Sequence, residues 1–354
     1  MKIGARQIGD GAYVIAELGV NHDGSADQAL AMTESAARAG AHAVKLQLFD
    51  ADLLMSRASR LAAYQSASGE RDPLEMLRRL QLSADDMAPV VRRAHELGLH
   101  AIVTVFSVPL VPEAERLPWD AYKAASPDLV HRPLLNALSA TGRPLIVSTG
   151  AAEVGEIERA LGWLGPARDR LALMQCVSAY PTPQDRAELG GVGVLGDLFD
   201  GPVGYSDHTP DLDTGGLAVA MGACLLEKHL THDRSAAGPD HAASVDGAGL
   251  ARYVTLAQQP GLFALDPRLD VPRVKRVLPE ERDVRTLSRQ SIVAARALPP
   301  GHRLAEGDLV VKRPGTGIEP WRLGEVVGRR LARAVEADCP LVEGDLRAGS
   351  AEAA

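Results

Sequence analysis

The amino-acid sequence predicts an α/β protein in which a closed (β/α)₈ TIM barrel is followed by a small β-rich domain. Eight short apolar runs alternate with helical patterns over about the first 230 residues, which is typical of parallel βαβ units. The 354 residues have room for a barrel of ~250 residues and an appended domain. After about residue 265 the pattern changes to short strands and tight turns.

Each predicted strand is an apolar run of six or seven residues bounded by turn residues. The eight runs are residues 13–18, 43–49, 101–106, 121–126, 144–150, 171–177, 203–208 and 225–231. Helical patterns occupy residues 26–39, 83–97, 153–164 and 214–224. Ser83 is a typical helix start, and Gly40 and Gly98 are typical helix ends. An open doubly wound sheet is the alternative, but no G-x-G-x-x-G motif follows the first strand, and eight units suit closure.

The chain divides into three parts that differ in composition and in the pattern of predicted strands and helices. Residues 1–265 form the predicted barrel, and residues 266–288 are rich in proline and charge, which predicts a linker. Residues 289–350 form the small β-rich domain. This domain is too small for a second enzyme, so we expect it to support or complete the barrel.

Composition excludes several classes of protein. Hydrophobic residues make up 46% and charged residues 24%, as in ordinary globular domains. The net charge of −8 argues against nucleic acid as a partner, although a few basic residues in one pocket could hold a small anion. The three cysteines are too few and too scattered for a disulfide framework. No signal peptide or membrane span is visible, so we expect a cytoplasmic protein without a membrane partner.

Polar residues near the carboxyl ends of the predicted strands indicate an active site, because barrel enzymes carry their catalytic groups on that face. Buried lysines need a partner of opposite charge, and an anionic ligand is the natural partner when serine and threonine hydroxyls accompany them. The residues concerned are Glu17, Lys45, Gln47, Thr104, Lys123, Ser126, Ser148, Ser178, Tyr180, Ser206, His208, Glu227 and His229.

His208 and His229 end adjacent predicted strands and could share one metal ion. Two imidazoles without a nearby thiolate suit Mn²⁺, with water and substrate oxygens completing the coordination; Mg²⁺ and Co²⁺ are alternatives. Catalytic zinc usually has three protein ligands and is therefore less favoured. Two purely structural histidines are the competing interpretation. Cys176 is interpreted as a small core residue, because no base is placed beside it in the sequence.

At these positions the sequence resembles the sialic acid synthases, which include N-acetylneuraminate synthase and its legionaminic, pseudaminic and spore-coat relatives. The resemblance covers almost the whole chain. It is carried by IAELGVNHDG (15–24), AGAHAVKLQLF (39–49), YKAASPDLVHRPLL (122–135), TGRPLIVSTG (141–150), CVSAYPTP (176–183), VGYSDHT (203–209) and EKHLTHDRSAAGPDHAAS (227–244). Residues 289–320 resemble the antifreeze-like (SAF, β-clip) domain that follows the barrel in this family.

The resemblance implies a condensation of phosphoenolpyruvate with the aldehyde of an N-acetylated amino sugar, of the N-acetylmannosamine or 2,4-diacetamido type. Nonulosonic acid and phosphate are the implied products. The matching phosphoenolpyruvate residues are Lys45, Thr104, Lys123, Ser126, Ser148, Ser178 and Ser206, and the matching acceptor contacts are Gln47, Tyr180 and Asp240. His208 and His229 match Mn²⁺ ligands, and Glu17 matches an essential carboxylate; Glu227 is a weaker candidate for the same role. Arg313 matches an arginine that reaches the partner's barrel, which implies a domain-swapped homodimer.

Three positions depart from the family pattern. Asp128 stands where the family has a glutamate that contacts the acceptor, Pro127 precedes it, and Val105 follows Thr104 in place of proline. We therefore expect Asp128 to bind the acceptor and to alter its choice. Two other functions compete: a synthase that uses a different aldose, and a catalytically silent barrel that binds a sugar or phosphorylated ligand.

Overall fold

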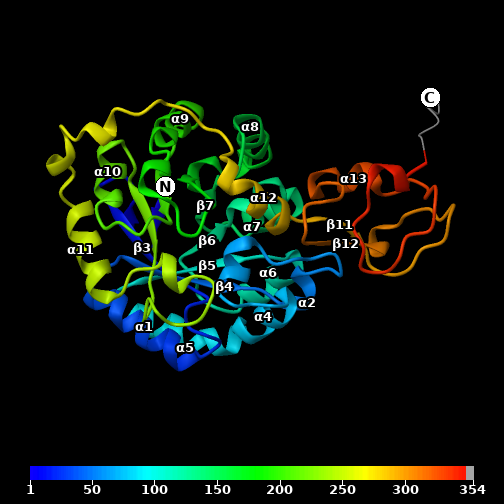
Figure 1. Ribbon diagram of the computed structural model, residues 1–354, viewed down its shortest axis with the longest axis horizontal. Helices are drawn as coiled ribbons and strands as arrows, with labels where there is room; N and C mark the ends of the chain where they lie inside the picture. The colour runs from blue at the N-terminus through cyan, green and yellow to red at the C-terminus, as the bar shows by residue number, and fades with distance from the viewer. Residues whose placement is uncertain (348–354) are drawn as a thin grey trace.

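Eight parallel strands close into a barrel in the computed structural model of the chain, which describes residues 1–347 (Figure 1). They are β3 (Tyr13–Gly19), β4 (Ala43–Leu48), β5 (His100–Val105), β6 (Ala121–Ala124), β7 (Leu145–Ser148), β8 (Leu171–Cys176), β9 (Val203–Asp207) and β10 (Leu225–His229). β10 pairs with both β9 and β3, which closes the ring. The predicted barrel is confirmed, and the open sheet is wrong.

The alternation of side chains along each strand explains why the barrel has an apolar base and a polar mouth. Residues two apart point to the same face of a strand. On β3 the inward side chains are Tyr13, Ile15 and Glu17, and on β4 they are Ala43 and Lys45. Tyr13, Ile15 and Ala43 pack in an apolar cluster at the base of the barrel. Glu17 and Lys45 lie nearer the carboxyl ends of their strands and line the cavity there. The outward residues pack against the helices.

Helices surround the strands and join them. They are α1 (Ala26–Arg38), α2 (Ala51–Leu54), α3 (Ala63–Ala67), α4 (Pro73–Leu80), α5 (Ala84–Glu96), α6 (Val111–Ala114), α7 (Arg132–Ala140), α8 (Val154–Trp163), α9 (Gly190–Leu198), α10 (Thr214–Ala220) and α11 (Gly247–Ala257). Ser83 caps α5 by accepting from Asp86 N, as its sequence signal predicts. α10 ends four residues earlier than predicted, because Gly222 takes a φ of 104° that turns the chain out of the helix.

Two short antiparallel pairs complete the described structure. β1 (Lys2–Ile3) and β2 (Arg6–Gln7) form a hairpin whose Ile3 packs at the base of the barrel. β11 (Ser291–Ala294) and β12 (Leu309–Lys312) belong to the small domain, together with α13 (Leu323–Val326) and a separate apolar core. This domain lies beside the barrel (Figure 1). Residues 348–350 of its predicted span lie outside the described residues.

The predicted linker, residues 266–288, contains regular structure. It includes the 3₁₀ turns η7 (Pro267–Leu269) and η8 (Pro279–Glu281) and the helix α12 (Arg282–Ser288). Glu281 and Val284 are buried, so this segment packs onto the barrel before the chain enters the small domain.

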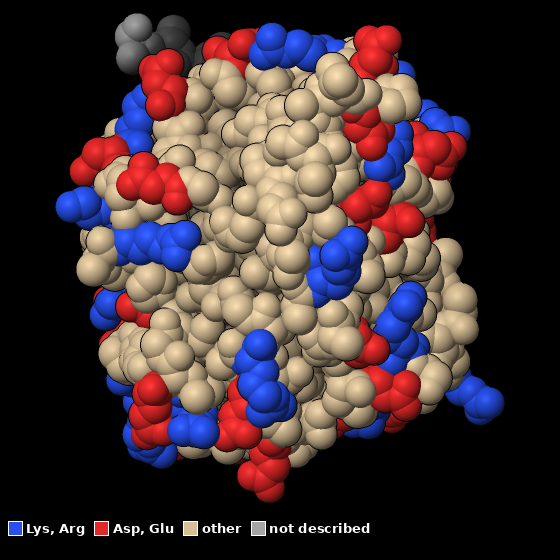
Figure 2. Space-filling view, turned by 90° about the vertical axis from the view of Figure 1, so that its left-hand side faces the viewer, with Lys and Arg blue, Asp and Glu red and all other residues tan. Residues whose placement is uncertain are grey.

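The face of the molecule in Figure 2 has few charged side chains at its centre, and residues of both signs lie around it. Across residues 1–347, none of the helices has the length and apolar character that a membrane span requires.

Candidate active site

One cavity opens at the carboxyl ends of the barrel strands and collects most of the predicted site residues. Those that line it are Glu17, Lys45, Gln47, Thr104, Lys123, Ser126, Ser148, Ser178, Tyr180, Ser206, His208, Glu227, His229, Asp240 and Arg313. Asp128 is the one predicted site residue that does not line it. The alternation described above brings these groups together from all eight strands and the loops that follow them.

Lys45 lies at the centre of a buried polar network. Its Nζ is 3.0 Å from Glu17 Oε2 and 3.7 Å from Glu227 Oε1, and it donates to Thr104 Oγ1 at 2.9 Å. Gln47 Nε2 donates to the other oxygen of Glu17 at 2.7 Å. Burial opposes the charged ammonium, but the two glutamates more than compensate and raise the pKa of Lys45.

Lys123 shares Glu227 with Lys45. Lys123 Nζ lies 2.8 Å from Glu227 Oε2, and Ser206 donates to Glu227 Oε1 at 3.2 Å. Burial lowers the pKa of Lys123 and raises that of Glu17, whereas both lysines hold the pKa of Glu227 well below its ordinary value in spite of its burial. Glu227 therefore orients the two lysines, and an anion that enters the cavity finds both ammonium groups in place.

Hydroxyl groups converge around Gly150 on the opposite side of the cavity. Gly150 N donates to Ser126 Oγ at 2.9 Å. A Cβ at this position would lie 2.3 Å from Ser178 Oγ and 2.8 Å from Ser126 Oγ, so only glycine allows the three loops to approach this closely. The buried Ser148 Oγ has no hydrogen-bond partner among the described residues. Such a cluster provides donors for the oxygens of a phosphate group.

His208 and His229 lie close together with their ring centroids 5.4 Å apart. His208 Nδ1 donates to Val177 O at 2.8 Å, which leaves Nε2 as the ring nitrogen that a metal ion could bind. His229 Nδ1 lies 3.7 Å from Asp240 Oδ2 and, among the described residues, has no hydrogen-bond partner. Each imidazole thus has one ring nitrogen without a hydrogen-bond partner among the described residues, and such a nitrogen binds a metal ion in its deprotonated form.

A metal with open coordination positions fits this pair. Within residues 1–347, no group of three or more His, Cys, Asp or Glu side chains could hold a metal ion. Two imidazoles would therefore leave the remaining positions to water and substrate oxygens, as Mn²⁺ accepts. Cys176 is buried as predicted, but its Sγ lies 3.7 Å from His208 Nδ1. The prediction that no base or thiol lies nearby is wrong, because β8 and β9 are neighbours in the barrel.

Asp128 faces the small domain instead of the cavity. It lies in the turn η2 (Ser126–Val130), which follows β6 and has Pro127 in its first positions. Gln290 Nε2 donates to Asp128 Oδ1 at 2.9 Å. The expected contact of Asp128 with the acceptor is therefore corrected: the structure does not bring this residue to the site.

Arg313 lies in the cavity of its own barrel. Arg313 N donates to Leu54 O at 2.8 Å, and Ser56 N donates to Arg313 O at 3.2 Å. Its guanidinium lies 5.6 Å from the centre of the Phe106 ring. Within the described chain, the β12 end of the small domain pairs with the loop after α2. That Arg313 reaches a partner's barrel in a domain-swapped homodimer stays a prediction.

Sequence reasoning missed one side of the cavity. Tyr64, from α3, stacks on Tyr180 with ring centroids 5.0 Å apart, and the Tyr180 ring lies 4.1 Å from that of His208. The missed apolar residues are Val20, Met76, Leu77, Leu80 and Phe106. They lie on helices and loops where an apolar side chain predicts only core packing, so no pattern in the sequence marks them as cavity residues.

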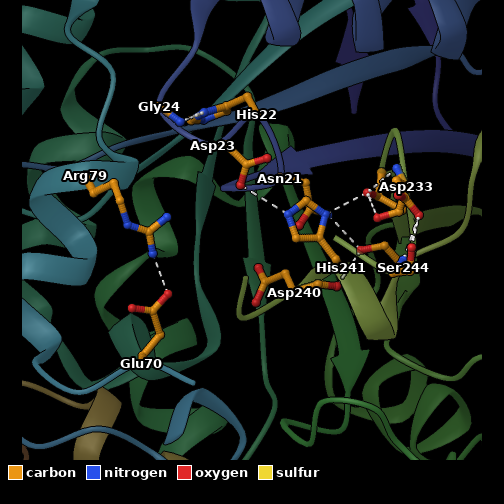
Figure 3. A network of polar contacts seen from close by, with 12 residues as sticks. Asn21, His22, Asp23, Gly24, Glu70, Arg79, Asp233, Asp240, His241 and Ser244 are labelled. Atoms are coloured by element: carbon orange, nitrogen blue, oxygen red, sulfur yellow. Dashed lines mark hydrogen bonds and ion pairs between the residues drawn. The ribbon is translucent and has the colours of Figure 1, made fainter. Parts of the chain in front are cut away.

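A network of polar contacts ties the loop after β3 to the loop after β10 (Figure 3). His241, in the loop after β10, has its Nδ1 2.7 Å from Thr231 Oγ1 of the same loop and its Nε2 3.2 Å from Asp23 Oδ1 of the loop after β3. Ser244 accepts from Asn21 Nδ2 at 2.8 Å and donates to Asp240 O at 2.7 Å. These contacts fix the backbone that carries the Asp240 carboxylate at the cavity.

Comparison with protein families decides the identity of the barrel. The profile of the NeuB family matches residues 32–260, which is more than half of the chain. The chain belongs to the NeuB family. A SAF domain follows over residues 289–347, as the sequence predicts.

Two curated NeuB relatives are N,N'-diacetyllegionaminic acid synthases. The protein of Legionella pneumophila is 34% identical over 337 residues, which cover 93% of each chain. That of Campylobacter jejuni is 33% identical over 321 residues, covering 89% of this chain and 94% of the relative. The crystal structure of the spore coat polysaccharide biosynthesis protein SpsE from Bacillus subtilis superposes with a TM-score of 0.84, at 26% identity and 99% coverage of both chains.

Proposed function

We propose that this NeuB-family protein condenses phosphoenolpyruvate with an N-acetylated amino sugar to give a nonulosonic, sialic-type acid and phosphate. The observation that carries the proposal is the single cavity that holds two buried lysines, a cluster of serine hydroxyls and two imidazoles. The names of the two legionaminic acid synthases among its relatives support the same reaction.

The chain's own residues suit the two anionic groups of phosphoenolpyruvate. Lys45 and Lys123 provide the positive charge for its carboxylate and phosphate, and the serine hydroxyls add donors. In the proposed reaction the enol carbon C3 forms a bond to the aldehyde carbon, water adds at C2, and the bond from C2 to the phosphate oxygen breaks. Burial raises the pKa of Glu17, which suits this carboxyl for proton transfer to or from the reacting atoms.

His208 and His229 would hold a divalent ion, with Mn²⁺ favoured over Mg²⁺ and Co²⁺. Such an ion supplies Lewis-acid polarisation of the aldehyde oxygen when it is bound. The ring nitrogen that each imidazole leaves without a hydrogen-bond partner supports this assignment.

For the acceptor we favour a 2,4-diacetamido sugar over an N-acetylmannosamine-type sugar. Both relatives compared above are named for products with two acetyl groups. The apolar side of the cavity, which includes Val20, Leu77 and Phe106, offers contacts for acetyl methyl groups. A synthase for a different aldose is the alternative. A homodimer and a cytoplasmic location stay predictions.

The deciding experiment is phosphate release from phosphoenolpyruvate with Mn²⁺, measured with a panel of free and 6-phosphorylated 2-acetamido and 2,4-diacetamido sugars. Release is expected with one sugar type and should be lost in His208→Ala. His95→Ala is the matched control, because His95 lies outside the cavity and its side chain is 36% exposed. No release with any sugar, together with no Mn²⁺ binding, would support the catalytically silent barrel instead.

A further inference from the structure

A buried carboxylate outside the barrel strands joins two of the loops that surround the cavity. Glu281 ends the turn η8 and is 1% exposed. Its Oε1 accepts hydrogen bonds from Ala151 N at 2.7 Å and from Ser178 N at 2.8 Å. Its Oε2 accepts from Leu278 N at 2.9 Å, which fixes the carboxylate within its own turn. Hydrogen bonds to an ionised acceptor are about twice as strong as neutral ones, so this contact holds the two loops firmly.

The two amides that Glu281 accepts belong to the loops after β7 and β8. The first loop carries Gly150 and follows directly on Ser148, the last residue of β7, and the second loop carries Ser178, two residues after the end of β8. These loops and Ser126 meet around Gly150 with no room for a single methyl group. A shift of either loop would therefore change the direction in which the hydroxyls face the cavity.

Ala151 has a backbone conformation that needs support. Its φ is 50°, in the left-handed region that is unfavourable for a residue with a Cβ. Arg285 Nη1 donates to its carbonyl oxygen, and Arg289 Nη2 donates to the same oxygen at 3.2 Å. Residues 281–289 thus hold both peptide groups of Ala151, the amide through Glu281 and the carbonyl through the two arginines.

We infer that Glu281 is a positioning residue that sets the spacing of the loops after β7 and β8 and so directs the serine hydroxyls toward the phosphate of phosphoenolpyruvate. The inference rests on the proposed function, in which these hydroxyls bind that phosphate. Glu281 does not line the cavity, so it acts only through the loops it joins. Residues 281–289 lead into the small domain. The packing of this segment on the barrel and the formation of the phosphate pocket are therefore coupled.

Substitution of Glu281 tests this inference through the two substrates separately. Glu281→Gln keeps the shape of the side chain but removes its charge and directs an amide N–H against Leu278 N–H. The KM for phosphoenolpyruvate should rise about tenfold or more, because small misplacements of binding groups are costly, whereas the KM for the acceptor sugar should not change. Calorimetry should show the same loss in phosphoenolpyruvate binding. Glu280→Gln is the matched control, since Glu280 is partly exposed and only approaches Arg186 at 3.7 Å.

A second substitution distinguishes positioning from general loss of stability. Glycine adopts a φ near 50° without penalty, so Glu281→Gln combined with Ala151→Gly should recover most of the phosphoenolpyruvate affinity. Because glycine also relieves the strain at this position, the melting temperature of each variant is measured beside its KM values, and recovery of phosphoenolpyruvate affinity beyond any recovery of stability supports positioning. Should Glu281→Gln fail to fold, Glu281→Asp carries the same test, because it keeps the charge and withdraws the oxygens by one methylene.

The outcomes separate this inference from the proposed function. A wild-type protein that releases phosphate, combined with a Glu281→Gln variant whose two KM values are unchanged or rise equally, would overturn the positioning role alone. A wild-type protein that binds no phosphoenolpyruvate would overturn both. A selective rise in the KM for phosphoenolpyruvate that Ala151→Gly reverses is the expected result.

Discussion

The carboxylate of Asp128 is bound to Gln290 at the point where the small domain begins. Gln290 Nε2 donates to Asp128 Oδ1 at 2.9 Å and to Phe106 O at 3.0 Å. Asp128 Oδ2 and Gln290 Oε1 have no hydrogen-bond partner among residues 1–347. The position at which the family resemblance implies a glutamate thus connects the two domains in this chain.

This contact predicts a stability that depends on pH. Burial raises the pKa of Asp128 from 3.8 to about 7, although Arg313 and Gln290 act in the opposite direction. The unfolded chain ionises first, so the stabilising effect of the protonated carboxyl is present below about pH 4 and is lost as the pH rises to about 7. Asp128→Asn should therefore be more stable than the wild type at pH 8, and the difference should shrink toward pH 5. Urea unfolding across this range measures it.

The control for Asp128→Asn is Asp169→Asn, whose side chain is 83% exposed and should change stability little. If the free energies of unfolding of the wild type and of Asp128→Asn change with pH in parallel, the raised pKa of the buried Asp128 is contradicted. Activity assays of Asp128→Glu with different sugars address the original hypothesis, and the structure predicts no change in acceptor preference.

The barrel and most of the cavity could be predicted, because side chains alternate between the two faces of a strand and the strands are recognisable as apolar runs in the sequence. Lys45 and Gln47, or His208 and Ser206, are two residues apart and must share a face once the strand is recognised. The place of Asp128 could not be predicted, because the turn η2 that follows β6 decides its direction. Tyr64 could not be predicted either, because its helix reaches the cavity only through tertiary packing. Glu281 lies in a segment whose composition indicated only a linker, and its amide partners are more than one hundred residues away.

Glu227→Gln should lower the stability of the protein and at the same time increase its stabilisation by a bound anion. The substitution leaves the buried Lys123 without its carboxylate, and loss of one partner of a buried pair costs about 3–5 kcal/mol. Because the pocket then has one negative charge fewer beside the same two lysines, phosphoenolpyruvate should raise the melting temperature of the variant more than that of the wild type. Differential scanning calorimetry with and without this ligand measures both effects. Glu113→Gln, a surface change, should alter neither effect. If phosphoenolpyruvate raises the melting temperature equally in all three proteins, the proposed effect of the Glu227 charge on anion binding is wrong.

Arg313 predicts how mixed subunits behave. In the described arrangement the arginine and the imidazoles of one cavity come from one chain. Arg313→Ala and His208→Ala, each expected to be inactive, should therefore remain inactive after they are denatured together and refolded. Recovered phosphate release would show instead that the small domains are exchanged between subunits, as the family resemblance implies. Refolding of wild-type chains under the same conditions is the control.

Metal dependence follows from the buried His229 Nδ1, which no described residue satisfies. An unsatisfied buried nitrogen is costly, and metal coordination removes that cost. Chelation should abolish phosphate release, and Mn²⁺ should restore it. His208→Ala and His229→Ala should each weaken Mn²⁺ binding by at least the ~10–100-fold that loss of an outer contact to a metal site typically causes. Electron paramagnetic resonance of free Mn²⁺ measures this binding without turnover, with His95→Ala as the matched control. Unchanged Mn²⁺ binding in both variants would place the metal elsewhere and leave the two imidazoles as substrate contacts.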